Sequence, residues 1–212
     1  MEVRDCLKGR RSIRKFTAQA VAPELIADLI ETTSYSPSWK HTQICRYVAV
    51  TGELKDRIAE ECTSFYPHNC EIIKSAPLLM VQCFIKNRSG FERDGSYSTH
   101  REGGWQMYDA GIQAGALCNA AHDLGLGSVI LGIFDDVKVA ELIHLSEDRE
   151  VVALIPMGYA DETPNAPRRK SGEDLLTFLS SFISGSDFYS VLIFCLYQKK
   201  RSTNYETFNE TT

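Results

Sequence analysis

The sequence lacks most of the short motifs that identify common enzyme classes. It has no G-x-G-x-x-G after a first strand, no Walker loop and no G-x-S-x-G, which argues against Rossmann, P-loop and α/β-hydrolase folds. Its five histidines show no metal-ligand spacing, and its seven cysteines include no C-x-x-C pair. Nothing points to a catalytic triad, and no metal site is expected.

Secretion signals and long apolar runs are also missing. The N-terminus, MEVRDCLKGRRSIRKF, carries charges where a signal peptide needs apolar residues, and no run of about 18 apolar residues occurs. The cysteine count is odd and several cysteines lie in apolar runs, so reduced, buried thiols are expected. We therefore expect a cytoplasmic protein with no membrane span. The net charge of −5 does not favour a nucleic-acid partner.

What is present is the composition of an ordinary globular protein of 212 residues, 43% hydrophobic and 24% charged. We assign residues 1–182 to one domain and residues 183–212 to a C-terminal extension of undefined role. The extension contains FYSVLIFCLY (188–197), an apolar patch too short to cross a bilayer. This patch is more typical of an added strand or an arm on a partner than of interfacial membrane contact.

Strands and helices alternate along the domain, which by itself favours a parallel sheet. Apolar and β-branched runs predict strands over 46–51, 77–84, 128–132 and 151–159. Apolar periodicity and start signals predict helices from Pro23, over 53–62, over 105–124 and after Asp135 or Asp136. The helix over 105–124 is rich in glycine and alanine, which suits either a tightly packed core helix or one that packs against a second subunit. Residues 86–104 are polar and predict a long loop.

Two basic clusters stand out in this acidic chain. The first is RRSIRKF (10–16), where arginines flank the hydroxyl of Ser12, and the second is Arg168, Arg169 and Lys170. Guanidinium groups and a serine hydroxyl together can bind a phosphate through charge-assisted hydrogen bonds. A basic run can equally be a solvated surface, and the residues alone do not show that the two clusters converge.

The segment SPSWKHTQ (36–43) is a polar loop between a predicted helix and a predicted strand. Its hydroxyl and amide groups can donate and accept hydrogen bonds, and Trp39 offers a flat apolar face. Such a loop could hold the edge of a heteroaromatic ring. An ordinary turn around Pro37 explains the same residues equally well.

Taken together, these segments resemble the FMN-dependent nitroreductase family. Three blocks carry the resemblance: RRSIRKF, SPSWKHTQICRYVAV (36–50), and LGLGSVILGIFDD with VVALIPMGYADETPNAPRRKS in the C-terminal half. The resemblance spans about residues 4–180, and the order of the blocks is more specific than any one of them. It implies an α+β fold with a mainly antiparallel central sheet flanked by helices. It also implies an intertwined homodimer with FMN bound at the subunit interface.

The resemblance assigns the FMN phosphate and ribityl end to Arg10, Arg11 and Ser12, with Arg169 and Lys170 closing on the phosphate. It implies that Arg14 lies near flavin N1 and the C2 carbonyl, and that Asn69 contacts the pyrimidine edge. It also implies that the backbone of Leu131 and Gly132 approaches N5.

The loop delivered by the partner subunit corresponds in this resemblance to Pro37, Ser38, His41 and Gln43. The chain departs from the family there, because His41 replaces the usual Asn and Ile44-Cys45 replaces the usual Pro-Trp.

The function implied is transfer of a hydride from NAD(P)H through flavin N5 to a flat acceptor such as a nitroaromatic or a quinone. No catalytic protein residue is required, because the cofactor carries the chemistry. Two alternatives stay open. One is an FMN-binding sensor or flavin-storage protein without significant turnover, and the other is an unrelated module that binds a phosphate ligand.

Overall fold

The computed structural model describes residues 1–179, and the chain divides into two compact units, Met1–Ala166 and Pro167–Thr212. The predicted boundary near residue 182 and the apolar patch 188–197 lie outside the described residues. The described part of the second unit carries one short helix, α7 (Gly172–Leu175), which begins with a capping box between Ser171 and Asp174. The first unit contains the sheet and all the other elements.

The first unit is built on one antiparallel sheet of four strands in the order β1-β2-β4-β3. Its strands are β1 (Cys45–Val50), β2 (Leu78–Ile85), β3 (Gly127–Ser128) and β4 (Arg149–Gly158). This confirms the α+β class and the mainly antiparallel sheet, and the parallel sheet suggested by the alternation of elements is wrong. The strand predicted over 128–132 is wrong in extent, because only an isolated bridge between Leu131 and Leu154 continues the pairing beyond Ser128.

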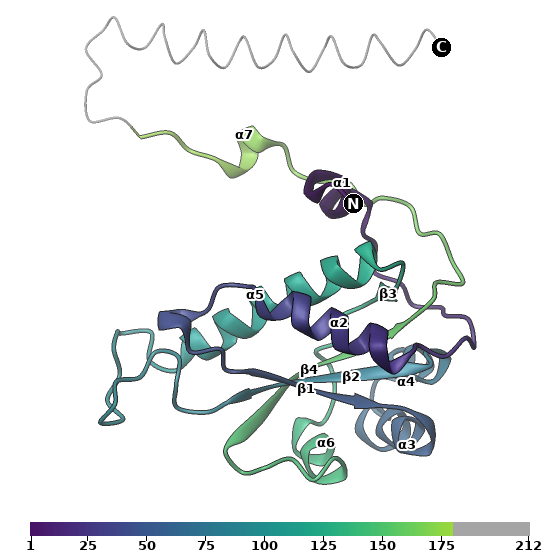
Figure 1. The fold of residues 1–212 in the computed structure, drawn as a ribbon, viewed down its shortest axis with the longest axis horizontal. Coiled ribbons are helices and arrows are strands. Elements are labelled where there is room, and N and C mark those ends of the chain that lie inside the picture. Colours follow the sequence, from purple (N-terminus) through teal and green to yellow (C-terminus); the bar gives the residue numbers. More distant parts are fainter. Residues whose placement is uncertain (180–212) are drawn as a thin grey trace, which may run out of the picture. The chain divides into compact units, whose positions relative to one another are not determined.

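Helices cover both faces of the sheet (Figure 1). One face carries α2 (Pro23–Ser34) and α5 (Gly104–Asp123), and the other carries α3 (Gly52–Cys62), α4 (Pro67–Ser75) and α6 (Asp136–Leu142). β2 lies between them and alternates its side chains, since Leu78 and Met80 join the first layer while Leu79 and Val81 join the second. Burial on both faces explains why β2 is a continuous apolar run.

Local signals placed several helix ends correctly. Pro23 begins α2, and the Asp135 side chain accepts the backbone N–H of Lys138 at 2.9 Å as the N-cap of α6. Gly125, with φ 79°, follows α5 in the left-handed conformation that was expected of it. Three α-helices of the described residues escaped prediction, namely α1 (Val3–Gly9), α4 and α7. No helix within residues 1–179 is long and apolar enough to span a membrane.

The segment after α1 lies against the sheet edge at β3. The Ile13 N–H donates to the Ser128 carbonyl at 3.1 Å, and the Thr17 N–H donates to the Tyr159 carbonyl at 2.9 Å. The close approach depends on Gly127, where a Cβ would lie 2.7 Å from Cγ1 of Ile13. The backbone of the first basic cluster is therefore held in one register against the sheet.

Candidate functional site

Arg10 and Ser12 line one pocket of about 360 Å³ beside the C-terminal half of α5. The other lining residues are Leu7, Gly115, Cys118, Asn119, Val129 and Ile130. Burial raises the pKa of the Cys118 thiol, and the nearby Arg10 charge lowers it in part. Neither the Arg10 guanidinium nor the Ser12 hydroxyl hydrogen-bonds to another residue of the described chain. The Arg10 guanidinium and the Ser12 hydroxyl are therefore both available to a ligand in this pocket, and together they form a donor set suited to a phosphate.

The guanidinium of Arg11, the neighbour of Arg10, is hydrogen-bonded to backbone carbonyls. Its guanidinium Nη1 donates to the carbonyls of Lys8, Gly9 and Arg10 at 2.6, 3.1 and 2.9 Å. These carbonyls lie at the C-terminal end of α1, where a cation satisfies unpaired acceptors and the helix dipole. The arrangement gives Arg11 a helix-capping role and leaves Arg10 to face the pocket.

Arg14 lies on the exposed side of the same segment. Its guanidinium donates to the Ser12 carbonyl at 3.3 Å, and its backbone N–H donates to the Glu162 carboxylate at 2.5 Å. Glu162 also lines a second pocket, of about 300 Å³, together with Arg10 and Arg11. A carboxylate there opposes the binding of a phosphate, so the pocket with Ser12 is the better anion site.

Asn69 lies close to the segment after β3, and the flavin contacts that the resemblance implies for both stay predictions. The Asn69 side chain is buried on α4, and its Nδ2 donates to the Ile133 carbonyl at 2.9 Å. Leu131 uses both of its backbone groups in bonds to Leu154, at 2.8 and 3.1 Å, so its N–H is not available to a ligand. Gly132 is exposed, and a Cβ there would meet nothing within 4 Å. Of the two predicted backbone contacts, Gly132 is the accessible one.

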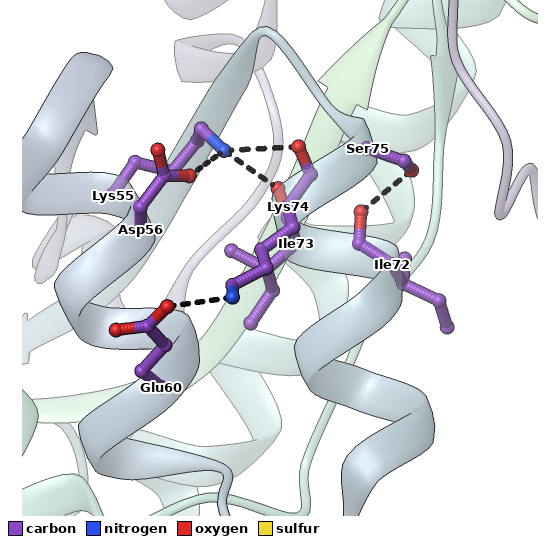
Figure 2. A network of polar contacts seen from close by, with 7 residues as sticks. All are labelled: Lys55, Asp56, Glu60, Ile72, Ile73, Lys74 and Ser75. Atoms are coloured by element: carbon purple, nitrogen blue, oxygen red, sulfur yellow. Dashed lines mark hydrogen bonds and ion pairs between the residues drawn. The ribbon is translucent and has the colours of Figure 1, made fainter.

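A buried lysine holds α4, and with it Asn69, in place (Figure 2). The Lys55 side chain is only 6% exposed, and its Nζ donates to the carbonyls of Ile73 and Lys74 at 3.0 and 3.3 Å. Its ammonium also pairs with Asp56 at 2.6 Å. The positive charge therefore satisfies the last carbonyls of α4 and joins that helix to α3.

The loop over 36–43 is compact and strained. Its middle is a short 3-10 turn, Trp39–His41, and Lys40, His41 and Gln43 have positive φ values of 42, 57 and 48°. The Gln43 N–H donates to Ser38 Oγ at 3.0 Å, and the Gln43 side chain lies 2.7 Å from His41 Nε2. Pro37, His41 and Gln43 are exposed, so the polar loop presents these groups outward.

This loop and the Arg10 pocket lie at different places along α5. The loop is bound by Asp109, and the pocket is lined by Cys118. Nine residues of helix separate them, which corresponds to about 13 Å along the axis at a rise of about 1.5 Å per residue. The second basic cluster, Arg168 to Lys170, is exposed in the second unit, and its part in the site stays a prediction.

Sequence reasoning missed Asp109, Ser89 and Lys55, each buried and hydrogen-bonded at or near the candidate site. Asp109 carried one signal, since it is the only acidic residue within α5 before its last position. Within residues 1–179, no group of three or more His, Cys, Asp or Glu side chains could hold a metal ion.

Comparison with known proteins places this arrangement in context. The model of the nitroreductase family matches residues 7–71 and 64–159. An oxygen-insensitive NADPH nitroreductase of Helicobacter pylori strain J99 is 26% identical over 205 residues, covering 83% of this chain and 96% of the relative. An iodotyrosine deiodinase of Hydra vulgaris is 25% identical over 198 residues, covering 81% and 71%. A nitroreductase structure from Desulfovibrio desulfuricans, solved in complex with FMN, superposes with a TM-score of 0.69 at 22% identity, covering 85% and 98%.

Proposed function

This chain belongs to the nitroreductase family, and we propose on that basis that it binds FMN and works as an NAD(P)H-dependent oxidoreductase. Relatives of the chain are described as an NADPH nitroreductase and as an FMN reductase that uses NAD(P)H, and a protein of the same fold was solved with FMN. When bound, FMN supplies the hydride-transfer chemistry between NAD(P)H and the acceptor. We propose a flat acceptor, a nitroaromatic or a quinone.

The observation that carries this proposal is the pocket shared by Arg10 and Ser12. Its volume of about 360 Å³ lies within the range of small-molecule sites, about 300–1,000 Å³. The residues fit the cofactor, because a guanidinium and a hydroxyl suit a phosphate, and the Asn69 Oδ1 is left to accept from a ring N–H. Apolar side chains of Ile130 and Ile133, about half exposed, lie on the same segment and would cover a ring face.

In this assignment the chain's own residues bind and orient rather than transfer protons. Arg10 binds the phosphate as a fixed cation, Ser12 donates a hydrogen bond to it, and Gly132 allows the backbone to approach the ring. Arg11 keeps its helix-capping role, whereas the family resemblance implies a phosphate contact for it. Arg169 and Lys170 stay predicted phosphate contacts, on the family resemblance alone.

We also propose that the protein is a homodimer and that the 36–43 loop serves the flavin of the partner. The separation of the loop from the Arg10 pocket supports this, since Asp109, which binds the loop, and Cys118, which lines the pocket, lie about 13 Å apart along α5. The exposed face of α5 supports it further, because the Tyr108 side chain is 61% exposed and a Cβ at Gly111 would meet nothing within 4 Å. Replacing Gly111 by Trp should then produce a folded monomer that loses FMN on gel filtration. Gly111→Ala, which is smaller, should remain a dimer.

The test of the function is the visible spectrum of the purified protein, followed by anaerobic titration with NADH and with NADPH. We expect flavin absorption that either nicotinamide bleaches. Arg10→Ala should weaken FMN binding by about tenfold or more, the effect of losing a charge-assisted hydrogen bond. Arg11→Ala removes the same charge, and we expect it to change FMN affinity much less. Colourless protein that takes up no FMN would contradict the proposal, and bound flavin without reduction would favour the sensor alternative.

A further inference from the structure

Asp109 is a buried carboxylate that joins two segments far apart in the sequence. It is 1% exposed, and both of its oxygens lie 3.0 Å from the backbone N of Trp39. Its Oδ2 also accepts the Ser89 hydroxyl at 2.5 Å, and Ser89 lies 2.7 Å from the Thr42 hydroxyl. The carboxylate therefore reaches both ends of the 3-10 turn in the 36–43 loop, directly through Trp39 and through Ser89 to Thr42.

Aromatic and charged contacts reinforce the same junction. The rings of Trp39 and Trp105 lie 4.4 Å apart, and Trp105 Nε1 donates to Thr99 Oγ1 at 2.8 Å. Lys40 lies 5.7 Å from the centre of the Trp39 ring and pairs with Glu92 at 2.8 Å. Ser89 and Glu92 belong to the polar segment 86–104, so two contacts tie that segment directly to the loop. Thr99 of the same segment reaches the loop only through Trp105, which packs on Trp39.

The loop needs such support because its backbone is strained. Three of the four residues from Lys40 to Gln43 have left-handed φ values, none of them glycine. Such conformations persist only where the surroundings hold them. The strained turn begins at Trp39, and Asp109 accepts a hydrogen bond from the Trp39 backbone N–H.

We propose that Asp109 is the positioning residue of the flavin-contacting loop, and that through Ser89 it makes the 36–43 loop and the 86–104 segment one unit. The inference rests on the proposed function, in which the 36–43 loop contacts FMN in the partner subunit. It adds that the 86–104 segment shapes access of the acceptor and also sets the geometry of the flavin site. A change in either segment would then alter both FMN affinity and the KM for the acceptor.

Substitutions at Asp109 separate hydrogen bonding from charge. In Asp109→Asn, the amide oxygen can still accept from Trp39 and the amide nitrogen can donate to Ser89, which turns that bond around. Asp109→Leu keeps a side chain of similar size but leaves the Trp39 N–H without a buried acceptor. Ser89→Ala removes the link that runs from Asp109 through Ser89 to Thr42 and leaves the Lys40–Glu92 pair in place. Thr63→Val deletes a buried hydroxyl at the C-cap of α3, on the face of the sheet opposite α5, and controls for general loss of stability.

The chain offers a direct spectroscopic readout. It contains two tryptophans, Trp39 and Trp105, and both belong to this junction. The tryptophan bands of the near-UV circular dichroism spectrum, and the tryptophan emission, therefore report on the junction in flavin-free protein. We expect Asp109→Leu to lose the tryptophan dichroism, to weaken FMN binding by about tenfold and to raise the KM for a quinone acceptor. Asp109→Asn should stay within about threefold of the original protein in both constants.

Ser89→Ala should affect the KM for the acceptor more than FMN affinity, and Thr63→Val should leave the tryptophan spectra unchanged. Unchanged spectra and FMN affinity in Asp109→Leu would overturn the proposal. Equal losses in Asp109→Asn and Asp109→Leu would also overturn it, because they would assign the carboxylate a purely electrostatic role. If the original protein binds no FMN, the proposed function fails, but the tryptophan spectra still test whether Asp109 holds the loop.

Discussion

Replacing Lys55 by methionine tests how the chain holds α4, the helix that carries Asn69. Methionine fills the space of the lysine stem and leaves no large cavity. The change removes the ammonium that donates to the Ile73 and Lys74 carbonyls at 3.0 and 3.3 Å and pairs with Asp56 at 2.6 Å (Figure 2). Two carbonyls at the end of a helix then lose their donor.

The expected cost follows from the number and kind of bonds lost. Hydrogen bonds to a charged group each contribute about 1.5–3 kcal/mol, but burying an ammonium carries a desolvation cost that methionine does not. Asp56 is half exposed and can be rehydrated. The net destabilisation should therefore be about 2–3 kcal/mol, close to the contribution of one such bond. For a chain of this size that lowers the melting temperature by about 4–12 °C.

The assay is thermal and guanidinium unfolding of flavin-free protein, because bound FMN would add stability by mass action. The matched control is Lys74→Met, which breaks the exposed pair between Lys74 and Glu60 at 2.6 Å. Exposed ion pairs contribute little, so this variant should unfold at the original midpoint. Equal losses in the two variants, or none at Lys55, would refute the reasoning that burial makes the Lys55 ammonium important.

Three further changes have defined outcomes. Trp39→Phe removes a buried Nε1 that has no acceptor among the described residues, so the free energy of unfolding should change by less than about 1 kcal/mol; a larger loss in guanidinium unfolding would mean that Nε1 has a partner. Burial raises the pKa of the Cys83 thiol from 9.0 to about 11, so the folded state favours the protonated form. Stability from this thiol is complete below pH 9 and is lost as the pH rises towards 11, and Cys83→Ala should flatten that decline in unfolding curves recorded from pH 8 to pH 11. Gly127→Ala places a Cβ 2.7 Å from Ile13 and should lower both the melting temperature and FMN affinity, whereas Gly104→Ala, where a Cβ meets nothing within 4 Å, should change neither.

Much of the fold could be predicted from the sequence because the signals that define its helices and strands are local. A buried β2 must be a continuous apolar run, Pro23 suits a first helical turn, and Asp135 can cap a helix wherever the chain runs next. Strand order and direction depend on contacts between distant residues, so alternation suggested a parallel sheet that the tertiary structure does not have. The family resemblance, carried by the order of blocks along the chain, supplied the antiparallel sheet instead.

At the site, the sequence by itself determined which residue types are available: arginines beside a serine near residue 10, and a polar loop containing Trp39. Only the tertiary structure decided how they are used. Arg10 and Arg11 are identical neighbours, yet one faces a pocket and the other caps α1, because the backbone between them turns from helix to extended chain. In the sequence, Asp109 is simply one acidic residue on a predicted helix. Folding buries its carboxylate beside Trp39. Because a buried carboxylate requires hydrogen-bond donors, it accepts from the Trp39 N–H and so holds the loop.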